Sequence, residues 1–209
     1  MTTDHKTVLE IAAAIIPMPI ITPRLIIRPV LPGDGQEVHE AVAETWDDLH
    51  RWMLWAKTAP EPVDATEENV RAAFAKFMLR EDFRMVAIEK ARGRMAVFTG
   101  IHRFDWEIRR MEIGYWTRKN LQGQGLATES TIALARYAFS ALNARTVAIC
   151  HADGNEASRR VIERIGFHYE GRLKNEGVLP DGRVVDKLWY SFTDISQVPA
   201  LECSWGGGP

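Results

Sequence analysis

A glycine-containing loop between an expected strand and an expected long helix is the part of the sequence best suited to chemistry. The strand ends near Thr117, the loop contains Gly123 and Gly125, and helical periodicity then continues to Leu142. Glycine lets a backbone approach an anion closely, and the first N–H groups of a helix have no acceptor within the helix. Because these groups lie at the positive end of the helix dipole, the arrangement predicts a phosphate-binding loop.

The spacing of the loop residues excludes two common kinds of phosphate loop. The chain has neither the GKS or GKT ending of a nucleoside-triphosphate loop nor the GxGxxG of a dinucleotide-binding fold. The pattern that remains is Gln122-x-x-Gly125-x-Ala127. Taken alone, these residues are equally consistent with an ordinary strand-to-helix turn that contains glycine.

The loop and the elements around it resemble the GCN5-related N-acetyltransferase (GNAT) family. The loop resembles the acetyl-CoA motif of that family, Q/R-x-x-G-x-G/A, and the order of strand, loop, helix, strand and helix is also the same. Further segments look like the RimJ/RimL branch, whose named members acetylate the amino termini of ribosomal proteins: Arg51–Ala56, Glu112–Trp116, Asn155–Ser158, Gly166–Phe167 with Glu170–Gly171, and Asp181–Arg183 with Asp186. The resemblance covers residues 22–193.

The resemblance implies acetyl-CoA as the cosubstrate and indicates which residues bind it. The loop amides would hold the pyrophosphate, and the pantetheine arm would pair with Ile113–Thr117 as an added strand. A backbone N–H near Tyr115 or Trp116 would polarise the thioester carbonyl, whereas the side chains of both residues fit ordinary core aromatics. The expected cofactor-binding residues are Tyr115, Trp116, Thr117, Gln122, Gly123, Gln124, Gly125, Leu126, Ala127, Thr128, Asn155 and Ser158.

Acetyl transfer to an amine also needs a group that accepts a proton, because a free amine is largely or partly protonated near pH 7. Glu112 and Glu176 are the candidate bases. In the RimL group the base is an acid in the loop after the strand that begins here at Phe167. Glu176 lies in that loop, one residue away from the family position, and a solvated loop glutamate is the alternative interpretation.

The departing thiolate of coenzyme A needs a proton or a hydrogen bond. Many family members provide a tyrosine seven residues after the motif asparagine, but Ile162 occupies that position here. Ser158 matches the serine of the RimL branch and is the candidate donor, with a local helix-capping bond as the alternative. Asn155 is expected to cap the same helix, to contact the pantetheine, or to do both.

Tryptophan and histidine residues offer further candidates for a binding site. Trp46, Trp52 and Trp55 are spaced almost as on one helix face. Trp52 and Trp55 are the candidate walls of an acceptor pocket, and a stripe of core residues is the alternative. Five of the six histidines, at positions 39, 50, 102, 151 and 168, form no metal-ligand pattern, so we expect surface or hydrogen-bonded roles and no metal.

The expected elements alternate as in an α/β domain. Helices are expected at 4–16, 33–57, 66–81, 125–142 and 155–165, and strands at 24–28, 83–89, 96–104, 110–116, 146–150, 167–173 and 184–193. With the resemblance, this order predicts a GNAT fold: a mixed, mostly antiparallel sheet, split in a V and flanked by helices. Residues 1–21 would form an N-terminal extension, 22–193 the domain, and 194–209 a tail that is frayed from Glu202 onward.

The composition limits the remaining possibilities. A chain of 209 residues with 46% hydrophobic and 26% charged residues fits one globular domain. The net charge of −2 argues against nonspecific binding to nucleic acid or to an anionic membrane. Residues 9–16 make a poor signal peptide, and no apolar run approaches the ~20 residues of a membrane helix. Cys150 and Cys203 form no paired spacing, so we expect neither a disulfide framework nor a zinc site, and a cytoplasmic location.

The sequence therefore predicts an enzyme that transfers acetyl directly from acetyl-CoA to a primary amine. The resemblance favours the amino terminus of a protein or peptide as the acceptor and a homodimer formed through the C-terminal strands. One alternative is a small amine, an antibiotic or a toxin as the acceptor, in a self-protection role. The other is a non-catalytic CoA-binding module, an idea motivated by Ile162.

Overall fold

The computed structural model describes residues 16–206. Its helices are α2 (Gly35–Trp52), α3 (Val63–Met78), α4 (Leu126–Ala141) and α5 (Glu156–Ile165), with short 3-10 helices η1 (Lys119–Leu121) and η2 (Ile195–Gln197). Its strands are β1 (Ile20–Ile21), β2 (Leu25–Pro29), β3 (Phe83–Glu89), β4 (Arg94–Asp105), β5 (Arg110–Thr117), β6 (Thr146–Ala152), β7 (His168–Val178), β8 (Val184–Phe192) and β9 (Ser204–Trp205). The helix expected at 4–16 lies outside the described residues, apart from its last position.

All of these strands belong to one sheet, in the order β7-β8-β6-β5-β4-β3-β2-β1-β9. Neighbouring strands are antiparallel, except for β5 and β6, which are parallel. A parallel pair needs a crossover connection, and here η1, the loop after it and α4 provide that connection. The prediction of a mixed, mostly antiparallel sheet flanked by helices is confirmed.

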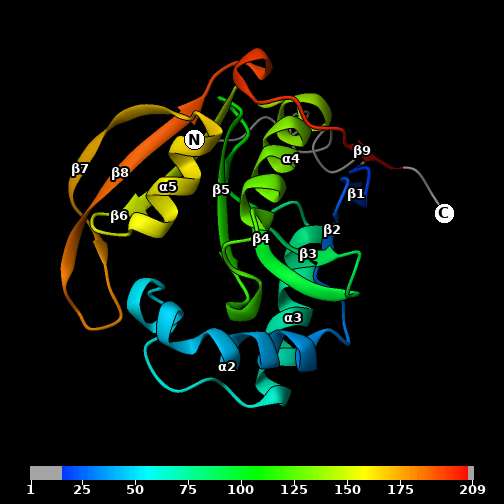
Figure 1. Ribbon diagram of the computed structural model, residues 1–209, viewed down its shortest axis with the longest axis vertical. Helices are drawn as coiled ribbons and strands as arrows, with labels where there is room; N and C mark the ends of the chain where they lie inside the picture. The colour runs from blue at the N-terminus through cyan, green and yellow to red at the C-terminus, as the bar shows by residue number, and fades with distance from the viewer. Residues whose placement is uncertain (1–15, 207–209) are drawn as a thin grey trace.

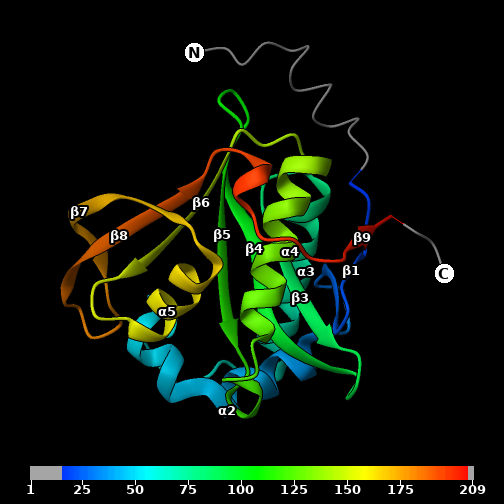
Figure 2. The same ribbon diagram turned by 45° about the horizontal axis from the view of Figure 1, so that its top comes forward.

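The parallel pair is also where the sheet splits. Pairing between β5 and β6 joins only Arg110–Glu112 to Thr146–Ala148. Beyond Glu112, the residues of β5 pair with β4 alone within the described part of the chain. Figure 2 shows β5 and β6 diverging from the end where they pair, with β7 and β8 following β6. The expected V is therefore present, and it leaves one edge of Ile113–Thr117 without a partner strand.

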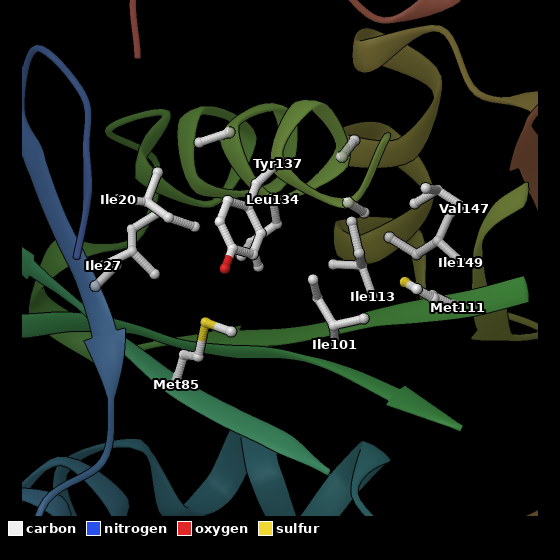
Figure 3. Close-up of a cluster of buried hydrophobic side chains, with 14 of the residues drawn as sticks. Ile20, Ile27, Met85, Ile101, Met111, Ile113, Leu134, Tyr137, Val147 and Ile149 are labelled. Atoms are coloured by element: carbon white, nitrogen blue, oxygen red, sulfur yellow. The ribbon is translucent and has the colours of Figure 1, made fainter. Parts of the chain in front are cut away.

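Helices cover both faces of the sheet. Helices α4 and α5 lie on one face, and α2 and α3 lie on the other (Figure 1). Side chains alternate between the two faces along each strand. On β4, for example, Ile101 belongs to the large core cluster under α4, and Phe98 belongs to a smaller cluster under α2 and α3. Figure 3 shows Leu134 and Tyr137 of α4 directed at the isoleucine, valine and methionine side chains of the sheet.

The C-terminal segment differs from the expected frayed tail. Ile20 pairs with Trp205, and Ile21 pairs with Ser204, so β9 is the edge strand of the sheet, next to β1. The ring of Trp205 also packs edge-on against Tyr137, with ring centroids 5.5 Å apart. A large aromatic side chain that finds a buried partner orders the backbone beside it, and this contact explains why the prediction for residues 202–206 was wrong.

Two other elements have bounds that matter for the site. Helix α2 ends at Trp52, and Met53 is extended, so Trp55 lies in the following loop and not on the helix face that includes Trp46. Strand β7 continues to Val178 and includes Glu176, although a loop was expected there. The extra length comes after an irregularity near Asn175, which has φ of 55° and donates its N–H to the side chain of Asp186 on β8. Among residues 16–206 no helix combines the length and the apolar composition needed to cross a membrane.

Candidate active site

The loop between β5 and α4 has the backbone conformation that its glycines predict. Gly123 has φ of 73° and Gly125 has φ of 76°, a left-handed region that other residues enter only with strain. Gly125 is the N-cap of α4, and no side chain caps the helix there. A carbon built at the Cβ position of Gly123 would meet no atom within 4 Å, so the space beside the loop is open.

The amides of this loop are free to bind an anion. No backbone N–H from Gly123 to Thr128 donates a hydrogen bond to an acceptor in residues 16–206, and the first bonded amide is Glu129 N–H, 3.0 Å from the carbonyl oxygen of Gly125. Gln122, Gly123 and Gln124 are exposed. The loop therefore presents a row of unpaired donors at the positive end of α4, as a phosphate site requires.

Most side chains of the loop contact other parts of the protein. Leu126 is buried in the core, and the hydroxyl of Thr128 is buried with no partner in the described structure. The side-chain amide of Gln122 donates to Asp48 on α2 at 3.0 Å and to the carbonyl of Thr117 at 3.2 Å. The predicted binding residues of the loop thus offer mainly unpaired backbone N–H groups, and the side chain of Gln122 ties the loop to α2 and to Thr117.

Helix α2 holds the start of the loop through a buried arginine. The guanidinium of Arg118 is inaccessible to solvent and donates to both oxygens of Glu44, at 2.6 and 2.7 Å. These hydrogen bonds raise the pKa of Arg118 and lower that of Glu44. The backbone N–H of Lys119 donates to Thr45 at 3.0 Å, so two successive residues of the connection are tied to α2.

A second ion pair beside the loop was not recognised in the sequence. Glu129, in the first turn of α4, accepts hydrogen bonds from the Thr22 hydroxyl at 2.6 Å and from the backbone N–H and Nε of Arg24. Burial raises the pKa of the Glu129 carboxyl, but these bonds outweigh burial and lower it. Arg24 also donates to the carbonyl oxygen of Gln124 at 2.8 Å. The guanidinium of Arg24 therefore lies next to the unpaired amides. Arg24 and Glu129 are 105 residues apart in the sequence, so the pairing has no local signal.

Tyr115 and Ser158 meet across the split in the sheet. The Tyr115 hydroxyl lies 3.2 Å from Oγ of Ser158 and donates to the Ser158 carbonyl oxygen at 3.3 Å. Burial raises the pKa of Tyr115 to about 12, so the phenol keeps its proton at neutral pH. Asn155 accepts a hydrogen bond from Ser158 N–H at 3.1 Å and therefore caps α5. Ile162, at the position of the family tyrosine, is fully buried in the core.

The two candidate bases lie near a common arginine, and each already has a partner. Glu112 accepts a hydrogen bond from Arg103 at 2.7 Å, and Glu176 accepts one from the indole N–H of Trp189. The pKa of Arg103 is raised, mainly by Glu112 and also by Glu176. Burial, together with Glu112, raises the pKa of the nearby Cys150 thiol to about 12. That thiol is therefore protonated at neutral pH, and a thiol is a poor nucleophile.

A cavity of about 780 Å³ opens on the face of the sheet covered by α2 and α3. Aromatic side chains form much of its wall, among them Trp46, Trp55 and Trp116, and Trp116 stacks on Phe98 with ring centroids 3.9 Å apart. Of the two predicted acceptor-pocket residues, Trp55 lines this cavity. Trp52 does not line it and lies against Gly154 in the loop before α5.

The cavity also contains His102, for which we expected a surface or hydrogen-bonded role. His102 and Asp82 both line it, and Nδ1 of His102 lies 2.6 Å from a carboxylate oxygen of Asp82. No spacing pattern joins these residues, since they come together only because β3 and β4 pair. In the described part of the chain, no group of three or more His, Cys, Asp or Glu side chains could hold a metal ion.

Comparison with known proteins identifies the family. The family model for the GNAT acetyltransferase domain matches residues 24–168. YdaF of Bacillus subtilis, a candidate ribosomal N-acetyltransferase, is 32% identical over 82% of this chain and 92% of its own length. The ribosomal-protein-serine acetyltransferase of Escherichia coli is 31% identical over 62% of this chain and 73% of its own length.

The solved structures agree on the fold. RimL, an acetyltransferase of the ribosomal protein L7/L12 solved with coenzyme A, superposes with a TM-score of 0.77 at 20% identity, over 84% of this chain and 97% of its own. At that identity the likeness supports the fold, whereas the domain match and the identity to YdaF establish the family. The chain belongs to the GNAT family of acetyltransferases, and it is an N-acetyltransferase of the RimJ/RimL type.

Proposed function

We propose that this enzyme transfers acetyl from acetyl-CoA to the amino terminus of a protein or peptide. The row of unpaired N–H groups from Gly123 to Thr128, at the start of α4, is the observation that carries the proposal. The names of YdaF and of the E. coli relative, which point to ribosomal proteins, support the choice of acceptor. Acetyl-CoA supplies an activated acetyl group as a thioester.

The phosphate loop suits a diphosphate for three reasons. Its amides are unpaired, its glycines leave open space, and Arg24 adds a positive charge beside it. Glu129 would repel an anion at this helix end, but its carboxylate is paired with Arg24 and Thr22. We assign the pyrophosphate of the cosubstrate to the N–H groups of Gly123–Thr128.

The split between β5 and β6 suits the arm of the cosubstrate. The free edge of Ile113–Thr117 offers backbone groups that can pair with amides, as in strand addition. A backbone N–H near Tyr115 or Trp116 would stabilise negative charge on the thioester oxygen. We assign to Ser158 the proton that the departing thiolate needs, since its hydroxyl lies at the same split and is held by Tyr115.

The acceptor is assigned to the cavity on the other face. A volume of about 780 Å³ is large enough for more than the amine alone, and its aromatic walls would hold the first residues of a peptide. Because the cavity is lined by Tyr115 and Trp116 of β5, an amine in it would approach the strand that carries the thioester. Both reactants would then meet in one complex, which favours direct attack.

Two measurements test this proposal. Acetyl-CoA at about 100 times its Kd should stabilise the protein by about 2.7 kcal/mol in thermal unfolding, and AMP at the same concentration by much less. Mass spectrometry should then find acetyl on the α-amine of peptides from ribosomal proteins, with a preference set by the first residues. Turnover of a panel of small amines, with no reaction on peptides, would reverse the assignment of the acceptor. Stabilisation without acetylation of any amine would instead favour a binding module.

A further inference from the structure

His102 is placed and oriented as a base would be at the proposed acetyl-transfer site. It lies on β4, on the face of the sheet that α2 and α3 cover, and it lines the cavity together with Asp82, Gly114 and Trp116. Its side chain is 31% exposed, so the ring is accessible from the cavity without being free in solvent. None of the roles proposed above uses this side chain.

Two glycines make room for the imidazole. Gly100 and Gly114 are directly opposite each other on β4 and β5. A carbon at the Cβ position of Gly100 would lie 2.7 Å from Cε1 and Nε2 of His102, and one at Gly114 would lie 3.5 Å from Nε2. The ring therefore lies over the two strands where they have no side chains. Its Nε2 edge is next to the backbone of Gly114, beside Tyr115 and Trp116.

Asp82 determines which ring nitrogen is free. A carboxylate accepts hydrogen bonds, so the 2.6 Å contact assigns the proton of the neutral imidazole to Nδ1. The lone pair is then on Nε2, which has no hydrogen-bond partner among residues 16–206. An imidazole held by a carboxylate at one nitrogen and open at the other is the arrangement of a general base.

The two glutamates predicted as bases are less favourably placed. Glu112 is the cross-strand neighbour of His102, but its carboxylate pairs with Arg103. Glu176 is engaged by the indole of Trp189. Neither glutamate lines the cavity, whereas His102 does.

We propose that His102 accepts the proton of the acceptor amine and that Asp82 is its positioning residue. This inference rests on the proposed acetyl transfer. The amine nitrogen forms a bond to the thioester carbon, the carbon–sulfur bond breaks, and the amine proton moves to Nε2 of His102. The thiolate takes the hydroxyl proton of Ser158, and Ser158 regains a proton from solvent. The imidazolium releases its proton to solvent, so protons balance and no other reactant is needed.

The first test replaces His102 with glutamine, which fills similar space but cannot take up a proton. H102Q should lower kcat about 10²- to 10³-fold, the range of general base catalysis, and leave the KM for acetyl-CoA within about threefold. The matched control is H168Q, because His168 is exposed on β7, outside the cavity. H168Q should keep wild-type kinetics.

The second test is the pH profile of kcat/KM. The rise of kcat/KM with pH should contain one step that comes from an enzyme group and not from the acceptor amine. This step should persist when the acceptor amine is changed, and it should be absent in H102Q. Other charged groups face the same cavity or adjoin the ring: Glu61 in the α2–α3 loop, Lys76 on α3, Asp82 and Arg84 at β3, Arg103 on β4 and Glu112 on β5. E112Q is therefore measured in parallel, and it should retain the step.

D82N keeps the ring and serves as the second variant if H102Q fails to fold. It should lower kcat about tenfold or more with little change in the KM for acetyl-CoA, and D82E should recover part of the loss. If the wild-type enzyme acetylates amines but H102Q and D82N retain its kcat and its pH profile, the role of His102 is overturned and the proposed function stands. If the wild-type enzyme binds acetyl-CoA and acetylates nothing, the proposed function and the role of His102 fall together.

Discussion

The glycine loop that follows β5 and the proposed acceptor cavity that β5 lines are built in opposite ways. The loop offers the unpaired backbone N–H groups of one continuous segment, and its Gln122 side chain bonds to Asp48 of α2. The cavity is formed by side chains from α2, α3, the loop between them and three strands. A site made of backbone groups tolerates changes of side chain but loses binding when the backbone conformation changes. A site made of side chains loses binding when those side chains are replaced.

The largest expected effect comes from changing the backbone of the loop. Gly125→Glu puts a residue with a side chain at φ of 76° and adds a negative charge beside the amides. We expect the affinity for acetyl-CoA to fall about 100-fold or more, measured by calorimetry. Gln124→Ala, one residue away on the exposed part of the loop, is the matched control and should change the affinity less than about twofold. Similar losses in both variants would mean that side chains, and not amides, bind the cosubstrate.

A smaller effect is expected at the split in the sheet. Tyr115→Phe removes the hydroxyl that lies 3.2 Å from Oγ of Ser158, and kcat should fall about tenfold because the serine is then less well placed. In a Ser158→Ala background the same change should have no further effect on kcat, since the two residues act as one unit. Tyr169→Phe, at an exposed tyrosine of β7, is the control. Independent losses in the double variant would show that Tyr115 does not act through Ser158.

Replacing Trp55 and Trp52 in turn tests whether the acceptor binds in the cavity, because only Trp55 lines it. Trp55 lines the cavity and is 57% exposed, so Trp55→Ala should raise the acceptor KM about fivefold with little change in the melting temperature. Trp52 lies against Gly154, so Trp52→Ala should lower the melting temperature and leave the acceptor KM nearly unchanged. Steady-state kinetics with a peptide acceptor and thermal unfolding of both variants provide the comparison. The opposite result would move the acceptor away from this cavity.

The smallest effect concerns the ion pair beside the loop. The pKa of Glu129 is lowered from its usual 4.5, so its pairing stabilises the folded state above that pH, and the stabilisation is lost as the pH falls through the lowered value. Glu129→Gln should therefore cost about 1 kcal/mol at pH 7, and the difference from wild type should shrink toward acid pH. Urea unfolding at several pH values measures it. Glu68→Gln, at an exposed position of α3, should show no such pH dependence.

The difference between the two regions also explains what the sequence could predict. The loop was predictable because glycine spacing and the start of a helix are local features, and its amides are indeed unpaired. Contacts between distant segments were not predictable. The contact of Tyr115 with Ser158 depends on how α5 packs against α4 and β6, and that of His102 with Asp82 depends on the pairing of β3 and β4. Chain spacing gives no signal for either pair.

The predicted ends of α2 and β7 were wrong for the same reason, since contacts between distant segments are not visible in the sequence. Helix α2 ends five residues before the predicted position 57, and this brings Trp55 to the cavity and separates it from Trp52. Strand β7 extends past Leu173 because Asp186 on β8 binds the backbone of Asn175, a contact that forms only in the hairpin. Propensity along the chain cannot anticipate a strand that is lengthened by its partner.

Helix α2 contributes to both of the proposed substrate sites. One part of its surface, with Trp46, forms a wall of the acceptor cavity, and another part, with Glu44 and Asp48, holds Arg118 and Gln122 at the start of the phosphate loop. A peptide that pushes this helix outward must also strain the bonds that shape the loop. The proposed acceptor site and the proposed phosphate site therefore share α2 as a common structural support.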